Sequence, residues 1–102
     1  MKSLSPKETL VLELLVAGRD RFGLELVEAS AGGLKRGTVY VTLGRMEAHG
    51  LVTSRTEDAP RDGDRPGGMP RRLYRATALG RRALGLAHEH ARVMQLKAEE
   101  AS

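Results

Sequence analysis

The sequence of 102 residues contains no cysteine, no tryptophan and only three aromatic residues, Phe22, Tyr40 and Tyr74. Without cysteine there is no disulfide scaffold, thiolate zinc site or cysteine nucleophile, which agrees with a cytoplasmic protein. With so few aromatics, neither the core nor a ligand pocket can be richly aromatic. The longest apolar run covers residues 14–17, whereas spanning a bilayer takes roughly 20 residues, so we expect no membrane segment. Residues 1–6 also lack the apolar stretch of a signal peptide.

Groupings of side chains that perform catalysis or bind metal are also missing. The sequence has no nucleophile paired with a base, no glycine-rich phosphate loop and no carboxylates clustered at a helical spacing suited to acid–base chemistry. His88 and His90 are two residues apart, so on a helix they point in different directions and make a poor metal pair. We therefore expect a protein that is not an enzyme and has neither a cofactor nor a metal site.

Positive charge is concentrated in one part of the chain. The net charge is +4, and residues 51–82 contain eight arginines against four acidic residues, while the remainder is close to neutral. A local basic segment is the electrostatic feature expected of a nucleic-acid-binding protein. The alternative is that these arginines only keep a small protein in solution.

Three short helices are predicted in the first half of the chain. Ser5, Pro6 and Glu8 make a helix start with a capping box, and this helix ends near Ala17. Apolar residues at helical spacing predict a second helix over about 22–31 and a third over about 35–49. Glycines at positions 32, 33 and 50 bracket the third helix.

A β-ribbon and a long helix are predicted in the second half. Residues 51–57 and 71–77 are rich in strand formers, with Leu73 and Tyr74 on opposite faces, and the segment 58–70 has too much glycine and proline for regular structure. Thr77 caps a helix that runs to about Glu99 and is on the order of 30 Å long. Two adjacent apolar stripes make its apolar face wider than one small domain needs, so we expect it to pack on a second copy of the chain as well.

Three helices followed by a two-stranded ribbon is the order of a winged helix-turn-helix domain. We predict a mainly α protein with a small β-ribbon, in which residues 1–77 form this domain and residues 78–102 form a C-terminal dimerisation helix and tail. The third helix would enter the major groove and the ribbon would lie beside the DNA backbone. The arginine excess falls on that ribbon. The alternative is a winged-helix protein-interaction module that does not contact DNA.

Four sequence blocks, taken in order, are specific enough to suggest a family. They are Phe22-Gly23-Leu24-Glu25-Leu26, Lys35-Arg36-Gly37-Thr38-Val39-Tyr40, His49-Gly50-Leu51-Val52 and Arg72-Leu73-Tyr74-Arg75-Ala76-Thr77. In this order and spacing the chain resembles the PadR family of bacterial transcriptional regulators, in particular its short-tailed members, over about residues 5–95. Val41 stands where that family usually has proline, so the operator of a relative does not carry over to this chain.

The resemblance implies a homodimeric repressor that binds double-stranded DNA at a pseudo-palindromic operator. Its last helix would pack against the first helix of the other subunit, and the predicted dimer interface comprises Leu12, Val16, Leu86, His90, Val93 and Met94. Some members of the family release DNA when aromatic compounds bind between the subunits. The last helix has no aromatic residue with which to build such a stacked pocket. Control by another ligand, by a partner protein, or by no effector at all are the alternatives.

The predicted DNA contacts come from the third helix and the start of the second strand. Tyr40 lies opposite the apolar stripe of its helix, and the alternative for it is packing beneath the wing. Arg45 could instead pair with an acidic neighbour, and aspartates partly neutralise the loop residues Arg61 and Arg65. The predicted contact set is Lys35, Arg36, Thr38, Tyr40, Val41, Arg45, Arg71 and Arg72. Phosphate contacts from such residues give affinity and salt sensitivity but little choice of sequence.

Overall fold

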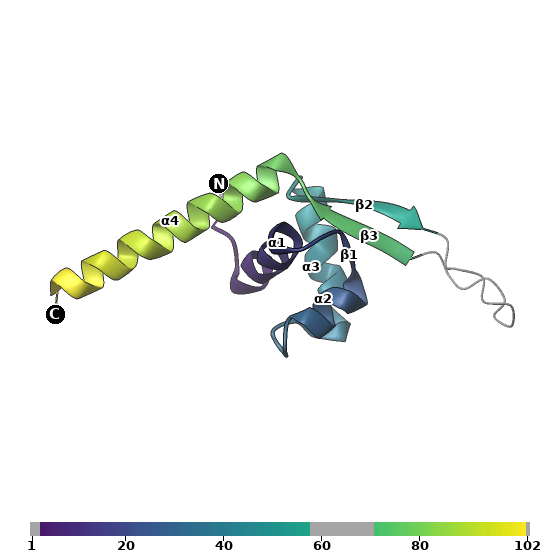
Figure 1. The fold of residues 1–102 in the computed structure, drawn as a ribbon, viewed down its shortest axis with the longest axis horizontal. Coiled ribbons are helices and arrows are strands. Elements are labelled where there is room, and N and C mark those ends of the chain that lie inside the picture. Colours follow the sequence, from purple (N-terminus) through teal and green to yellow (C-terminus); the bar gives the residue numbers. More distant parts are fainter. Residues whose placement is uncertain (1–2, 58–70, 102) are drawn as a thin grey trace, which may run out of the picture.

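The computed structural model describes residues 3–57 and 71–101 of the chain. Figure 1 shows three short helices gathered beside the sheet, with a long last helix that extends away from them on the side opposite to the strand hairpin. The prediction of a mainly helical fold with a small β-structure is confirmed. In chain order the elements are α1 (Pro6–Ala17), β1 (Arg21–Phe22), α2 (Gly23–Ala29), α3 (Arg36–Ala48), β2 (Val52–Glu57), β3 (Arg71–Ala76) and α4 (Ala78–Ala101).

Three of the helix ends form as the sequence predicts. The Ser5 hydroxyl accepts a hydrogen bond from the Glu8 N–H at 3.2 Å, and the Glu8 carboxylate accepts one from the Ser5 N–H at 2.8 Å, which completes the capping box of α1. Gly50 follows α3 with a φ of +76°, a left-handed conformation that favours glycine. The Thr77 hydroxyl accepts from the Gly80 N–H at 3.0 Å and donates to the Gly50 carbonyl at 2.6 Å. Thr77 therefore caps α4 and also ties it to the end of α3.

The sheet has three strands in the order β1-β3-β2, whereas the sequence predicted a two-stranded ribbon. β2 pairs with β3 in the expected antiparallel way, with Val52 opposite Ala76. β1 adds to the other edge of β3, with Phe22 opposite Leu73, so Phe22 is a strand residue rather than the first residue of the second helix. A strand of two residues is too short to show alternation, and its partner lies far along the chain, so only the tertiary fold reveals it.

The core is a single cluster of buried residues that includes one side of α3. Val39, Leu43 and Met46 form one stripe of α3 and are completely buried. They share the cluster with residues of α1, α2, the sheet and the start of α4. Because this stripe is fully covered, the rotation of α3 about its own axis is fixed, and its other faces are left for the surface.

Leu12 was predicted at the dimer interface, but this prediction is wrong, because Leu12 is completely buried in the core of its own chain. The beginning of α4 covers it. A Cβ placed on Gly80 would lie 3.0 Å from the Leu12 Cδ2 atom and would overlap the Leu51 carbonyl oxygen. The start of α4 therefore packs against Leu12 and the residue 51 main chain at a distance that only glycine permits. Val16 is only partly buried against the same core, so the strip that the sequence indicated on α1 is reduced to Val16.

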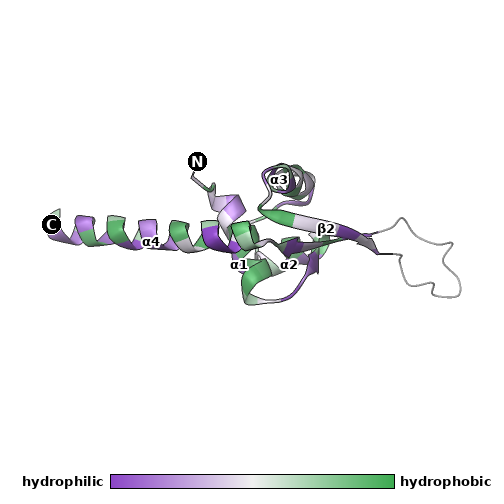
Figure 2. Cartoon of the chain, turned by 90° about the horizontal axis from the view of Figure 1, so that it is seen from above, coloured by the Kyte–Doolittle hydropathy of each residue, from purple (hydrophilic) through white to green (hydrophobic). Residues whose placement is uncertain are grey.

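α4 has two parts with different surroundings. Gly80, Ala83 and Leu84 in its first turns are buried in the domain. The His88 imidazole lies 3.0 Å from the Glu13 carboxylate of α1, and every residue from His88 to Ala101 is exposed. Figure 2 shows that apolar residues nevertheless recur along the projecting part of α4. Within the described ranges, none of the helices has the length and the apolar character needed to cross a membrane.

Candidate nucleic-acid interface

The side of α3 that faces away from the core carries most of the predicted contact residues. Arg36, Thr38 and Arg45 are exposed, and Tyr40 and Val41 are 51% and 61% exposed. No ion pair within residues 3–57 and 71–101 engages Arg36 or Arg45, so the alternative of an acidic partner for Arg45 is absent from this part of the chain. This face of α3 is therefore basic, accessible and rigidly held by the buried stripe behind it.

The N-terminus of α3 is itself suited to an anion. Lys35 occupies the N-cap position, and its side chain makes no capping hydrogen bond to the first turn. The Thr38 and Val39 N–H groups bond back to the Lys35 carbonyl oxygen at 3.1 and 2.9 Å, while no acidic residue lies in the first turn. A helix N-terminus carries a partial positive charge, and here the side chains of Lys35 and Arg36 add two full charges.

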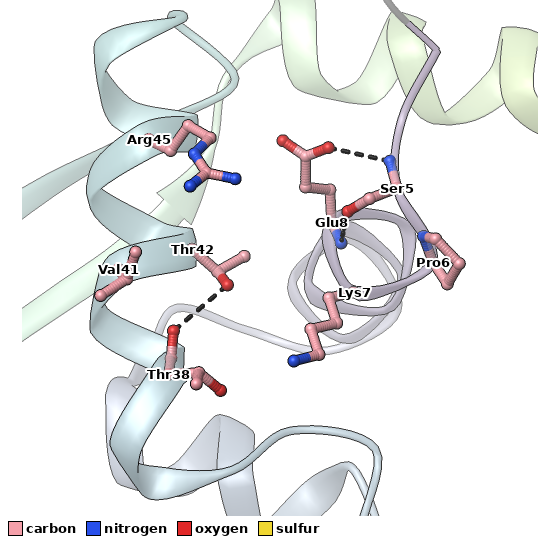
Figure 3. Close-up of a pocket in the computed structure, with 8 residues that line it drawn as sticks. All are labelled: Ser5, Pro6, Lys7, Glu8, Thr38, Val41, Thr42 and Arg45. Carbon is pink, nitrogen blue, oxygen red and sulfur yellow. Dashed lines mark hydrogen bonds between the residues drawn. The ribbon is translucent and has the colours of Figure 1, made fainter.

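An open groove of about 500 Å³ separates the exposed side of α3 from the N-terminus of α1. Figure 3 shows Arg45 reaching into this groove from α3 and Lys7 reaching into it from α1. Thr42 and then Thr38 follow Arg45 along the α3 side of the groove. Sequence reasoning missed Lys7, because a lysine in the first turn of a capped helix looks like any other solvated charge until the fold sets it opposite α3.

The Tyr40 ring lies over the start of α2. A Cβ atom on Gly23 would fall 2.6 Å from the Tyr40 Cε1 atom, so the ring covers the position that a side chain would occupy. The ring therefore packs on α2, whereas the alternative was packing beneath the wing, and Tyr40 is still 51% exposed, so its contact with DNA stays a prediction. Nearby, the Tyr74 phenol is buried in the core, and this desolvation, followed by the Glu47 carboxylate, raises the pKa of Tyr74.

A chain of hydrogen bonds joins the end of α3 to the wing, the hairpin formed by β2 and β3. The Ser54 hydroxyl of β2 donates to the Glu47 carboxylate at 2.6 Å, and the Arg72 guanidinium donates to the Ser54 hydroxyl oxygen at 2.9 Å. Arg72 is exposed, as its predicted role requires, but it is also held to the helix through Ser54. No sequence pattern indicates this link, because Glu47 and Ser54 are polar residues without a distinctive spacing.

The opposite face of the wing holds its arginines in a different way. Both oxygens of the Asp20 carboxylate are engaged: Arg55 donates to it at 2.8 Å, and Arg75 donates through Nε and Nη2 at 3.0–3.2 Å. The two guanidinium groups lower the pKa of Asp20, and the carboxylate raises the pKa of Arg75. Arg71 lies 4.5 Å above the Phe22 ring centroid in a cation–π contact. Part of the wing's positive charge is therefore compensated within the chain.

Most of the predicted contact residues form one connected surface, and Arg71 lies apart from it. Lys35, Arg36, Thr38, Tyr40, Val41 and Arg45 lie together on α3 and its cap, and Arg72 is joined to that helix through Ser54. Arg71 is exposed at the far end of β3, where its guanidinium rests on Phe22. The loop residues Arg61 and Arg65 lie outside the described residues.

Residues 11–86 of the chain match the family model described as the transcriptional regulator PadR-like family. The chain is 24% identical to a PadR family transcription regulator from Clostridium difficile, with a TM-score of 0.77 and coverage of 94% of this chain and 97% of that one. It is 27% identical to a PadR family transcriptional regulator from Eggerthella lenta, with a TM-score of 0.73 and coverage of 92% and 79%. A PadR-like transcription factor from Bacteroides fragilis has a TM-score of 0.79 at 17% identity, with coverage of 93% and 88%. No curated protein matches the chain.

Replacing Asp20 with asparagine tests the link that holds β2 and β3 to β1. At pH 7 we expect Asp20→Asn to lower the free energy of unfolding by about 1 kcal/mol, the order of two partly exposed ion pairs. The pKa of Asp20 is lowered in the folded state, so its contribution is present above the usual value of 3.8 and is lost as the pH falls through the folded pKa. Urea unfolding of both proteins at pH 7 and in stronger acid measures the difference.

Glu57→Gln is the matched control, because Glu57 pairs with the same Arg55 at a longer distance of 3.7 Å and is about half exposed. We expect it to change stability by much less than Asp20→Asn. An equal loss at neutral and acid pH for Asp20→Asn would contradict the assignment of the effect to the carboxylate charge.

Proposed function

Because the chain belongs to the PadR-like family of transcriptional regulators, we propose that it is a homodimeric repressor that binds a pseudo-palindromic operator. α3 enters the major groove, and the wing formed by β2 and β3 lies on the DNA backbone. Residues 1–77 act as the DNA-binding domain, and residues 78–102 act as the dimerisation helix and tail. With DNA as its partner, we expect the protein to work in the cytoplasm.

The observation that carries this proposal is the contrast between the two sides of α3. One side is completely buried, while the other presents Arg36 and Arg45, which form no ion pair with the described residues, together with Thr38 and the half-exposed Tyr40. An exposed helix with basic and hydroxyl side chains, fixed in orientation by its own core, is what readout of a DNA groove requires. Lys7 and Lys35 flank this surface and supply further charge for the phosphates.

We assign sequence readout in the centre of this surface to Val41. It is the most exposed of the large apolar residues of the described chain, and it is flanked one turn away on each side by Gly37 and Gly44, around whose Cβ positions there is open space. Without side chains at those two positions, the helix can approach the groove floor closely at Val41. The apolar feature of the major groove is the thymine methyl group, so Val41 is suited to contact a thymine.

We assign dimerisation to the projecting part of α4. Leu86, Val93 and Met94 remain 40–60% exposed although they recur at helical spacing, and His90 lies among them. Burying such a stripe in water requires another apolar surface. A second copy of the chain supplies one through its own α4 and through the half-buried Val16 of α1. The dimer then presents two α3 helices to half-sites about 34 Å apart.

The first prediction from this proposal concerns DNA binding itself. A duplex enriched from a random library by the protein should bind far more tightly than a scrambled duplex of the same composition. Between about 50 and 200 mM salt the dissociation constant should rise at least about 100-fold, as expected for roughly four phosphate contacts. Mobility shift or fluorescence anisotropy measures both. Binding that is indifferent to salt, or equal on both duplexes, would favour the interaction-module alternative.

The second prediction concerns Val41. Replacing each thymine of the enriched duplex in turn with deoxyuridine removes one methyl group, and at one position per half-site the affinity should fall about fourfold, the value of burying one methyl-sized group. Val41→Ala should bind the thymine duplex as weakly as the wild type binds a duplex with deoxyuridine at that position in both half-sites, and it should not discriminate between the two duplexes. If Val41→Ala keeps the full discrimination, Val41 does not read the methyl group.

The third prediction concerns the dimer. Leu86→Asp places a charge in the apolar stripe of α4, so it should give a monomer by light scattering and weaken operator binding at least about 100-fold, because the second half-site is no longer tethered. Gln95→Asp is the matched control, since it adds the same charge to the same helix outside the two apolar stripes. An intact Leu86→Asp dimer would refute this interface.

A further inference from the structure

Gly23 is a glycine that its backbone conformation does not explain. It is the first residue of α2 and is buried. Gly32 and Gly50 have φ values of +94° and +76°, which favour glycine, but Gly23 does not share that left-handed conformation. Within a helix, alanine is preferred over glycine on propensity alone. The reason for glycine at this position therefore lies in what surrounds it.

What surrounds it is the ring of Tyr40. A Cβ atom on Gly23 would lie 2.6 Å from the Tyr40 Cε1 atom, 2.8 Å from Cζ and 2.9 Å from the phenolic oxygen. All three distances are shorter than a carbon atom can approach without displacing its neighbour. The three nearest atoms all belong to the tip of one side chain, so a methyl group here would displace the Tyr40 phenol.

We propose that Gly23 is a positioning residue for DNA recognition, whose missing side chain forms the seat that holds the Tyr40 hydroxyl at the DNA-facing surface. This inference rests on the proposed function. Gly23 belongs to α2 and Tyr40 to α3, so the seat also sets the phenol of one helix against the start of the other. The seat does not bury Tyr40, which remains half exposed as a residue.

Fixing the ring matters because a phenol on a surface helix otherwise samples several rotamers, and ordering it on DNA would cost free energy at the moment of binding. A ring already seated on Gly23 delivers its hydroxyl without that cost. The expected effect of losing the seat is therefore a loss of affinity, with the fold unchanged. Alanine is a good helix former at the first position of α2, so Gly23→Ala should be at least as resistant to urea as the wild type.

The seat can be tested first without DNA. The chain has two tyrosines, Tyr40 and Tyr74, so protein labelled with 3-fluorotyrosine gives two ¹⁹F NMR signals, which Tyr40→Phe assigns. Gly23→Ala should shift the Tyr40 signal and move that of Tyr74 much less. Gly85→Ala is the matched control, because nothing lies within 4 Å of its Cβ position, and it should move neither signal. An unmoved Tyr40 signal in folded Gly23→Ala overturns the proposal.

The second test is a double-mutant cycle with the duplex enriched by the wild type. Gly23→Ala and Tyr40→Ala should each weaken binding about tenfold or more, the order of one lost hydrogen bond to a charged group. The double variant should bind no worse than Tyr40→Ala, because without the ring the new methyl group has nothing to displace. Gly85→Ala should bind like the wild type.

The outcomes separate this proposal from the proposed function. Losses that multiply in the double variant, or full affinity in Gly23→Ala or in Tyr40→Ala, overturn the role of Gly23 while wild-type binding upholds the regulator. If the wild type enriches no duplex, the proposed function fails and the positioning role fails with it. A shifted Tyr40 signal together with a non-additive cycle supports both.

Discussion

The arrangement of the candidate interface depends on the burial of one stripe of α3. Val39, Leu43 and Met46 are fully enclosed, and a chain of this size has only one core in which to bury them. Once that stripe is inside, the remaining sides of the helix have no freedom of rotation. The basic N-terminus, the open face around Val41 and the flank with Tyr40 then take fixed places on the surface. Recognition chemistry on α3 is in this sense a consequence of apolar packing behind it.

Two kinds of contact attach the neighbours of α3 to this frame. On one flank, the Tyr40 ring fills the space left by Gly23 of α2. Towards the wing, Glu47 and Ser54 carry a hydrogen-bonded chain to Arg72. Hydrogen bonds that involve charged groups are stronger than neutral ones, so this short chain can hold an exposed guanidinium in place. The helix and the wing are thereby joined through side chains as well as through the main chain.

Less of the positive charge of the wing is free to bind DNA phosphates than its arginine content suggests. Asp20 holds Arg55 and Arg75, and Arg71 rests on Phe22, so these groups stabilise the sheet as well as charging it. Among the cations of the described chain that have no such partner, Arg36 and Arg45 lie on α3 and Lys7 lies across the groove on α1. α4 also has two parts with different surroundings: Ala83 and Leu84 complete the core, while the residues from His88 onward are exposed and project from it.

The sequence by itself determined the helices, the start of α1, the end of α3, the β2–β3 hairpin and the family, because these depend on local signals such as the Ser5–Glu8 capping box, Gly50 and the buried stripe of α3. Only the tertiary structure decided what covers each surface. It placed Leu12 under Gly80 instead of at a subunit interface, made Phe22 a strand residue, set Lys7 across from Arg45, and laid Tyr40 on Gly23. The physical reason is that periodicity identifies which side of an element is apolar, whereas the choice of neighbour depends on distances between residues that are remote along the chain.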